Sequence, residues 1–301
     1  MTAANGGGGF LLIFLISTIL IGFPLLQAEF ALGRSAGVSA IKTFGKLGKN
    51  NKYNFIGWIG AFALFILLSF YSVIGGWILV YLGIEFGKLF QLGGTGDYAQ
   101  LFTSIISNPA IALGAQAAFI LLNIFIVSRG VQKGIERASK VMMPLLFIVL
   151  PQLFDKMPFG TIFYVLFLFA TVTSSVVMLE INVDNITNQD NSKRAKWSVI
   201  LGILTFVFGI PSALSYGVMV DVHIFGKTFF DAMDFLVSNL LMPFGALYLS
   251  LFTGYIFKKA LAMEELHLDE RAWKQGLFQV WLFLLRFVIP IIIVVFIAQF
   301  M

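Results

Sequence analysis

The run Met157–Leu179, MPFGTIFYVLFLFATVTSSVVML, decides the class of protein to which this chain belongs. It contains no charged side chain, and a helix needs about 20 apolar residues to cross the hydrocarbon core of a bilayer. Hydrophobic residues make up 59% of the 301 residues and charged residues only 12%, which is more apolar surface than one aqueous core can bury. The sequence therefore predicts an integral membrane protein.

Further charge-free runs of this kind are spread along the whole chain. A transmembrane β-barrel would show stretches of about ten residues with alternating polarity, whereas these runs are longer and uniformly apolar. We therefore expect an all-α fold of about eight transmembrane helices in a single membrane domain, residues 1–301. The other runs are Gly6–Ala28, Tyr53–Ile84, Tyr98–Ser128, the short Val141–Phe154, Trp197–Val220, Phe235–Phe257 and Gln275–Met301, the last interrupted only by Arg286.

Lysine and arginine are concentrated in alternate loops between these runs. Short cytoplasmic loops retain such residues, so the basic loops are predicted inside and both termini outside the plasma (inner) membrane. The net charge of +5 is then explained by topology and the anionic inner leaflet, and it gives no argument for nucleic acid. The rich set is Arg34, Lys42, Lys46, Lys49, Lys52, Arg129, Lys133, Arg137, Lys140, Lys193, Arg194, Lys196, Lys258, Lys259, Arg271 and Lys274, against Lys88, Lys156 and Lys227 in the other loops.

The sequence offers no motif for catalysis. There is no cysteine, which excludes disulfides and thiolate metal sites. The two histidines, His223 and His267, fall in separate loops and form neither a metal site nor a catalytic pair. No nucleophile with a base, phosphate loop or zinc motif is present, so we do not expect an enzyme.

Three acidic residues lie in or beside the apolar runs. Glu29 follows the first run, Glu180 follows Met157–Leu179, and Asp234 precedes Phe235–Phe257. Carboxylates at membrane depth are costly and usually face a bundle interior or a watery cavity. The alternative is that all three lie at the membrane interface, and position in the sequence does not separate the two.

Hydroxyl side chains cluster toward the end of the run Met157–Leu179. Residues at i, i+3 and i+4 share a helix face, so the carbonyl of Ala170 and the hydroxyls of Thr173 and Ser174 can point at one spot. Neutral oxygens in a membrane suit a monovalent hard cation such as Na⁺. The alternative is that these hydroxyls bond back to the preceding turn or allow two helices to approach closely.

Four stretches resemble, in the same order, the neurotransmitter:sodium symporter family, particularly its bacterial amino-acid transporters. Residues 1–150 resemble the family's helices two to five, and residues 151–301 resemble helices eight to eleven. The resemblance implies a reduced form of the family's inverted-repeat bundle. The stretches are NGGGGFLLIFLISTILIGFPLLQAEFALGR (Asn5–Arg34), SRGVQKGIERASKVMMP (Ser128–Pro144), LPQLFDKMPFG with FATVTSSVVMLE (Leu150–Gly160 and Phe169–Glu180) and AMDFLVSN (Ala232–Asn239).

The resemblance implies roles for individual residues. The family's second sodium site takes the helix-eight oxygens that match Ala170, Thr173 and Ser174. Its substrate pocket, which binds an amino acid, uses positions that match Tyr71, Leu67, Ser174 and Met178. The family's core carboxylate, extracellular gate and inner release route match Glu29, Asp234 and Glu180, respectively.

Two parts of the family pattern have no match in this sequence. Helix one would precede the first stretch, and helices six and seven would lie between Leu150 and Pro151. The family's broken helices one and six supply the half-helix ends that hold substrate and ions. We therefore expect a sodium-coupled symporter of amino acids or related small amines that is incomplete or inactive as written. The alternatives are a non-transporting membrane scaffold that associates with itself or with companion helices, and a leak pathway.

Overall fold

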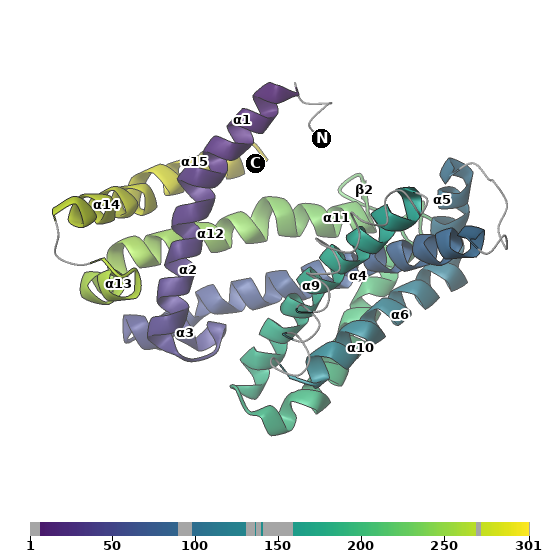
Figure 1. Ribbon diagram of the computed structural model, residues 1–301, viewed down its shortest axis with the longest axis horizontal. Helices are drawn as coiled ribbons and strands as arrows, with labels where there is room; N and C mark the ends of the chain where they lie inside the picture. Colours follow the sequence, from purple (N-terminus) through teal and green to yellow (C-terminus); the bar gives the residue numbers. More distant parts are fainter. Residues whose placement is uncertain are drawn as a thin grey trace. The chain divides into compact units, whose positions relative to one another are not determined.

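The computed structural model describes residues 7–89, 98–130, 136, 140, 159–268 and 272–300, and it is almost entirely helical (Figure 1). Seven helical segments in this part of the chain are long and apolar enough to cross a membrane. The prediction of an all-α membrane protein is confirmed. The short run Val141–Phe154, which would be the eighth segment, lies outside the described residues. The seven segments are Gly8–Ala36, Asn51–Gly87, Pro109–Ser128, Thr161–Thr187, Asn191–Leu214, Phe229–Ile256 and Lys274–Ala298.

The described chain forms two compact units, residues 1–61 with 238–301 and residues 62–237. Each is described separately, and the expectation of one domain over residues 1–301 stays a prediction. The long helix α4, Asn54–Leu89, begins in the first unit and continues in the second.

The first unit is formed by the two ends of the chain. Its core includes Ala28, Leu32, Phe252, Trp281 and Leu285, and the indole of Trp281 donates a hydrogen bond to the Pro24 carbonyl at 3.1 Å. Its elements are α1 Gly8–Ser17, η2 Thr18–Gly22, α2 Phe23–Ala36, α3 Ala40–Gly48, η3 Asn51–Tyr53, the start of α4, most of η6 Leu236–Leu241, α12 Met242–Leu251, η7 Phe252–Ile256, α13 Lys259–Glu265, α14 Ala272–Phe283, η8 Leu284–Val288 and α15 Ile289–Ala298.

The second unit is a bundle in which α6, α9 and α10 lie side by side (Figure 1). Its apolar core joins Leu68 of α4 to Phe119 of α6 and to Val176 and Leu179 of α9. Its elements, besides most of α4, are α5 Tyr98–Ser107, α6 Pro109–Ser128, α9 Phe159–Thr187, α10 Asn191–Leu214, β1 His223–Ile224, β2 Lys227–Thr228 and α11 Phe229–Phe235.

The structure changes the expected boundaries of several runs. The run Tyr98–Ser128 is two helices, because Asn108 accepts hydrogen bonds from the first-turn amides of α6 and Pro109 begins that helix. Glu29 and Glu180 follow their apolar runs, and α2 and α9 each continue about two turns beyond them. A short antiparallel hairpin, His223 opposite Thr228, was not expected from the sequence.

Candidate functional site

The hydroxyl cluster lies on α9 and converges on one backbone oxygen. The Ala170 carbonyl accepts hydrogen bonds from Thr173 Oγ1 at 2.9 Å and from Ser174 Oγ at 3.1 Å. Thr173 Oγ1 also lies 3.0 Å from the Phe169 carbonyl. Both hydroxyls therefore make the back-bonds that the structural alternative predicted. A hydroxyl that donates its proton still has two lone pairs, so this geometry leaves both oxygens able to face a cation.

This cluster occupies the open face of α9. Ala170 and Ser174 are exposed, as is Val177 one turn further on, whereas Val172 and Val176 on the other side are buried at 4% and 3% exposure. Ser174 thus lies on the side of α9 away from the core of the second unit, and Thr173 beside it is half-buried. Any further ligand for an ion at this place has to come from whatever covers the open face.

The chemistry of the three oxygens fits a monovalent hard cation. None carries a formal charge, and no group of three or more histidine or acidic side chains that could hold a metal ion occurs in the described part of the chain. A divalent ion in such a site would lack the carboxylates that normally balance its charge. Three oxygens from one helix do not surround an ion, so the cluster is one side of a site.

The predicted substrate positions lie on two helices of the second unit. Tyr71 and Leu67 are half-buried on α4, and Met178 is half-buried on α9. Met178 packs against the core cluster to which Leu68 of α4 also belongs. No hydrogen bond joins the Tyr71 hydroxyl to Ser174 among the described residues. The structure thus places these side chains on two helices that share a core, and their role as one pocket stays a prediction.

Glu180 forms an ion pair inside the second unit. One carboxylate oxygen contacts Arg194 Nη1 of α10, and the two side chains are only 13% and 7% exposed. Arg194 Nε also donates to Asn191 Oδ1 at 3.3 Å. The other oxygen of Glu180 is buried and has no hydrogen-bond partner among the residues that the structure describes. The arginine explains how α9 tolerates a carboxylate two turns before its end, because a buried charge is stable only when it is paired.

The other two acidic residues have exposed side chains. Glu29 lies within the membrane segment Gly8–Ala36, and Asp234 lies in the last turn of α11. Their predicted roles as core carboxylate and gate stay predictions.

The sequence reasoning missed two polar contacts between helices. Ser175 Oγ donates to Asn123 Oδ1 of α6 at 2.7 Å, and Gln116 Nε2 of α6 donates to Ser72 Oγ of α4 at 3.2 Å. All four side chains are at most 1% exposed. The signal was present, because Gln116 and Asn123 are seven residues apart, on one face of an otherwise apolar helix.

Comparison with known proteins identifies the family. The model of the sodium:neurotransmitter symporter family matches residues 1–91. The sodium-dependent transporter YhdH of Bacillus subtilis is 36% identical in an alignment that covers 98% of this chain and 90% of the relative. The chain belongs to the sodium:neurotransmitter symporter family.

Two further relatives support the assignment of this chain to the family. A sodium-dependent transporter of Haemophilus influenzae is 23% identical over 98% of the chain and 91% of its own length. The crystal structure of MhsT in complex with L-phenylalanine superposes with a TM-score of 0.85 at 27% identity, covering 98% of this chain and 92% of MhsT. The expected transporter fold is confirmed.

The symporter chain is shorter than its relatives within the aligned region. The alignment with YhdH runs over 408 positions, whereas the whole chain has 301 residues, so more than 100 positions have no counterpart here. This agrees with the expectation that an interior part is missing. The expected junction between Leu150 and Pro151 lies outside the described residues, and the absence of helix one stays a prediction.

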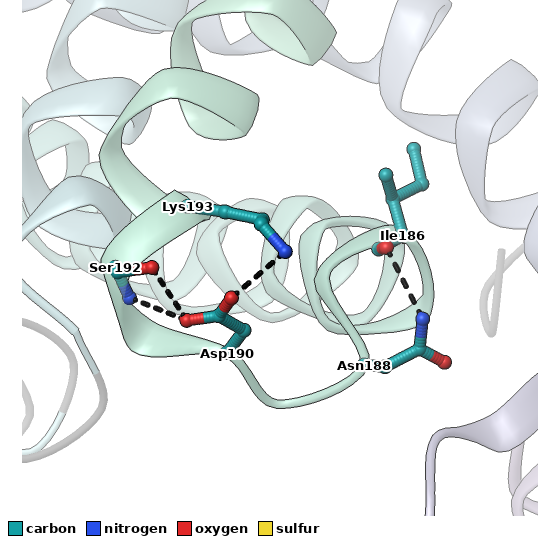
Figure 2. Close-up of polar contacts among 5 residues, drawn as sticks. All are labelled: Ile186, Asn188, Asp190, Ser192 and Lys193. Carbon is teal, nitrogen blue, oxygen red and sulfur yellow. Dashed lines mark hydrogen bonds and ion pairs between the residues drawn. The ribbon is translucent and has the colours of Figure 1, made fainter.

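The turn between α9 and α10 of this symporter chain is held by Asp190 (Figure 2). Its carboxylate accepts hydrogen bonds from the hydroxyl and the amide of Ser192 at 2.6 and 3.0 Å, and it lies 3.0 Å from Lys193 Nζ. The Ser192 hydroxyl, followed by Lys193, lowers the pKa of Asp190 to about 2. The two residues before it, Asn188 and Gln189, have positive φ angles of 51° and 68°.

A second polar contact stabilises the loop at the opposite end of α10. Tyr216 Oη donates to Asp231 Oδ1 at 3.1 Å, and Thr228 Oγ1 donates to Asp231 Oδ2 at 2.8 Å. Burial, together with the negative charge of Asp231, raises the pKa of Tyr216 to about 12. The protonated tyrosine is the form that donates to Asp231.

Proposed function

We propose that this chain is the greater part of a sodium-coupled amino-acid symporter in which α9 supplies one side of a sodium site. The observation that carries the proposal is the Ala170 carbonyl, with the Thr173 and Ser174 hydroxyls 2.9 and 3.1 Å from it on the open face of the helix. Sodium is cargo in this proposal, so it enters and leaves with the substrate. A site without a formal charge favours that behaviour, because it binds the ion without holding it as tightly as carboxylates would.

The substrate class is proposed from two facts. MhsT, whose fold this chain shares, was crystallised with L-phenylalanine. The half-buried phenol of Tyr71 on α4 has a hydroxyl that can donate to a carboxylate, and Leu67 one turn before it offers an apolar wall. A small amino acid presents both a carboxylate and, in many cases, an apolar side chain.

We further propose that the chain by itself does not couple sodium to uptake. Over 100 aligned positions of YhdH have no counterpart here, and the three oxygens of α9 by themselves do not surround an ion. Coupling requires that ion and substrate stabilise the same closed state, and half a ligand set supplies too little binding free energy for that. Supplying the missing segment as a separate polypeptide is expected to restore uptake.

Amino-acid uptake by the chain together with the separately supplied segment tests the sodium site. Vesicles that contain the chain and the segment of YhdH without a counterpart here would be assayed with labelled neutral amino acids in Na⁺ and in K⁺. Thr173→Val is expected to weaken sodium activation about tenfold or more, because one ion ligand is lost. Thr171→Val is the matched control, since Thr171 is buried on the other side of α9 and its hydroxyl donates to the Phe167 carbonyl at 2.7 Å.

Three results would each refute one part of this proposal. Equal sodium dependence in the Thr173→Val and Thr171→Val variants would remove α9 from the sodium site. Strong sodium-dependent uptake by the chain alone would refute the incompleteness. Uptake that is driven equally by K⁺ would refute sodium coupling itself.

One observation favours the alternative of a non-transporting chain that associates with other helices. Large apolar side chains are exposed all around α1, and only 6% of the most apolar stretch of the segment Gly8–Ala36 is buried. A companion helix or a second copy of the chain would cover this surface. Cysteine cross-linking at Leu12 and Ile16 in vesicles would detect either partner, and labelling by lipid reagents alone would count against both.

A further inference from the structure

The short helix α3 presents a row of lysines on its outer face. Lys42 and Lys46 are four residues apart and lie on one side of α3, Lys49 follows the helix as its C-cap, and all three are exposed. Lys52 follows within one turn and is also exposed. No acidic residue occurs between Glu29 and Glu85 in the sequence, so the chain around α3 carries positive charge alone.

The opposite face of α3 is fixed to the first unit. Phe44 stacks edge-on against Phe252, with ring centroids 5.1 Å apart, and the amide of Gly45 donates to Asn54 Oδ1 at 2.9 Å. At Gly57 of α4 a side chain would lie 2.5 Å from the Cα of Ile41, so only glycine allows this approach. Because α3 is held in this way, its lysines are fixed in the outward direction.

The position of α3 along the chain places it at a membrane boundary. It lies between the end of the segment Gly8–Ala36 and the start of the segment Asn51–Gly87. Exposed aromatic side chains flank it at the same end of these segments, Phe30 at 57% and Trp58 at 61% exposure. Aromatic side chains of this kind are enriched where lipid headgroups meet the hydrocarbon core.

Neighbouring charges leave part of this row free. Arg34 is paired with Glu265 at 3.2 Å, and Lys46 Nζ donates to the Ala36 carbonyl at 2.6 Å. Within the described residues, Lys42 and Lys49 form no ion pair. Two exposed ammonium groups, one on α3 and one at its C-cap, are thus not paired with an acidic side chain in the part of the chain that the structure describes.

Lys49 follows α3 as its C-cap with φ at 52°, in the left-handed region where glycine is favoured over a residue with a side chain. A glycine at this position would therefore stabilise the helix end.

We propose that α3 is a binding surface for anionic phospholipid headgroups of the leaflet that it borders, with Lys42 and Lys49 as the principal contacts. Basic groups beside a membrane segment attract acidic lipids by about a factor of five per lysine. Fixing the lysines on a helix that is already packed lowers the ordering cost of binding.

Lipid titration of the purified full chain in a neutral detergent tests this surface. The thermal unfolding midpoint would be followed against added phosphatidylglycerol, phosphatidylcholine or soluble glycerol phosphate. Phosphatidylglycerol alone is expected to raise the midpoint, by linkage to the folded state, and 1 M salt is expected to remove the effect. The variant Lys42→Gln/Lys49→Gln is expected to need roughly 20-fold more of this lipid.

Two control variants separate the proposal from general charge and from misfolding. Lys258→Gln/Lys259→Gln removes the same charge from another basic loop and is expected to respond like the unmodified chain. Lys49→Gly is expected to keep or raise the midpoint without lipid while weakening the lipid response about fivefold. Three results would each overturn the proposal. They are an equal loss of the phosphatidylglycerol response in the Lys258→Gln/Lys259→Gln variant, an equal rise of the midpoint with phosphatidylcholine, and the same rise with soluble glycerol phosphate.

Discussion

Replacing Gly76 by alanine is expected to push α4 and α6 apart. A Cβ at this position would lie 2.7 Å from the backbone nitrogen of Gln116 and 2.8 Å from the carbonyl carbon of Ala115. Both are backbone atoms of a buried helix, so they can move away only if the helices separate. Overpacking of this kind costs about 1–3 kcal/mol, and a backbone obstacle places the expected cost in the upper half of that range.

Gly83→Ala on the same helix is the matched control. A Cβ at Gly83 would meet no atom within 4 Å. Alanine favours the helix over glycine by about 1 kcal/mol in both variants, so this gain cancels in the comparison. The difference between the two variants is then the overpacking cost, about 2–3 kcal/mol in favour of Gly83→Ala.

Thermal unfolding in detergent measures this difference. At about 2–4 °C per kcal/mol, the midpoint of Gly76→Ala is expected on the order of 4–12 °C below that of Gly83→Ala. Gly209→Ala should behave like Gly76→Ala, because its Cβ would lie 2.5 Å from the Ser69 carbonyl oxygen. Midpoints within a degree of each other for Gly76→Ala and Gly83→Ala would refute the inferred close contact of α4 with α6.

Three further predictions concern the loops. The pKa of Asp190 is lowered to about 2, so its carboxylate stabilises the fold above pH 3.8. This stabilisation disappears as the pH falls from 3.8 through about 2. Over this pH range the thermal unfolding midpoint of the unmodified chain should approach that of Asp190→Asn. Asp231→Asn should lower the pKa of Tyr216 from about 12, because a negative charge is removed, and absorbance titration of the phenol at alkaline pH would show it; an unchanged pKa would contradict the contact. Gln189→Gly should raise the unfolding midpoint by the equivalent of about 1 kcal/mol, because Gln189 has a φ of 68°, and a lower midpoint would exclude this explanation.

The membrane segments could be predicted from composition because the bilayer sets their length. A charge-free run such as Met157–Leu179 has few alternatives to a spanning helix, and the structure contains α9 at that place. The helix ends were predicted less well. Glu180 ends the apolar run, yet α9 continues to Thr187, and Arg194 of α10 pairs with the carboxylate.

The candidate sodium ligands were also found from the sequence, since the spacing of Ala170, Thr173 and Ser174 needs only helix geometry. Which hydroxyls are open and which are buried could not be found in this way. Ser175, next to Ser174, is buried and bonded to Asn123, and only the packing of α6 against α9 decides that.

The sequence by itself determined the solvent of this protein and its helical class, because these depend on residue types along one chain and on the thickness of a bilayer. Its family was predicted from four stretches that resemble that family. The tertiary structure alone decided which face of each helix is covered. Glycines such as Gly57 and Gly76 permit approaches that no periodicity reveals. Partners far apart in the chain, such as Gln116 and Ser72, meet only when the helices pack. Contacts of this kind depend on the relative position of several helices, and local sequence does not specify that position.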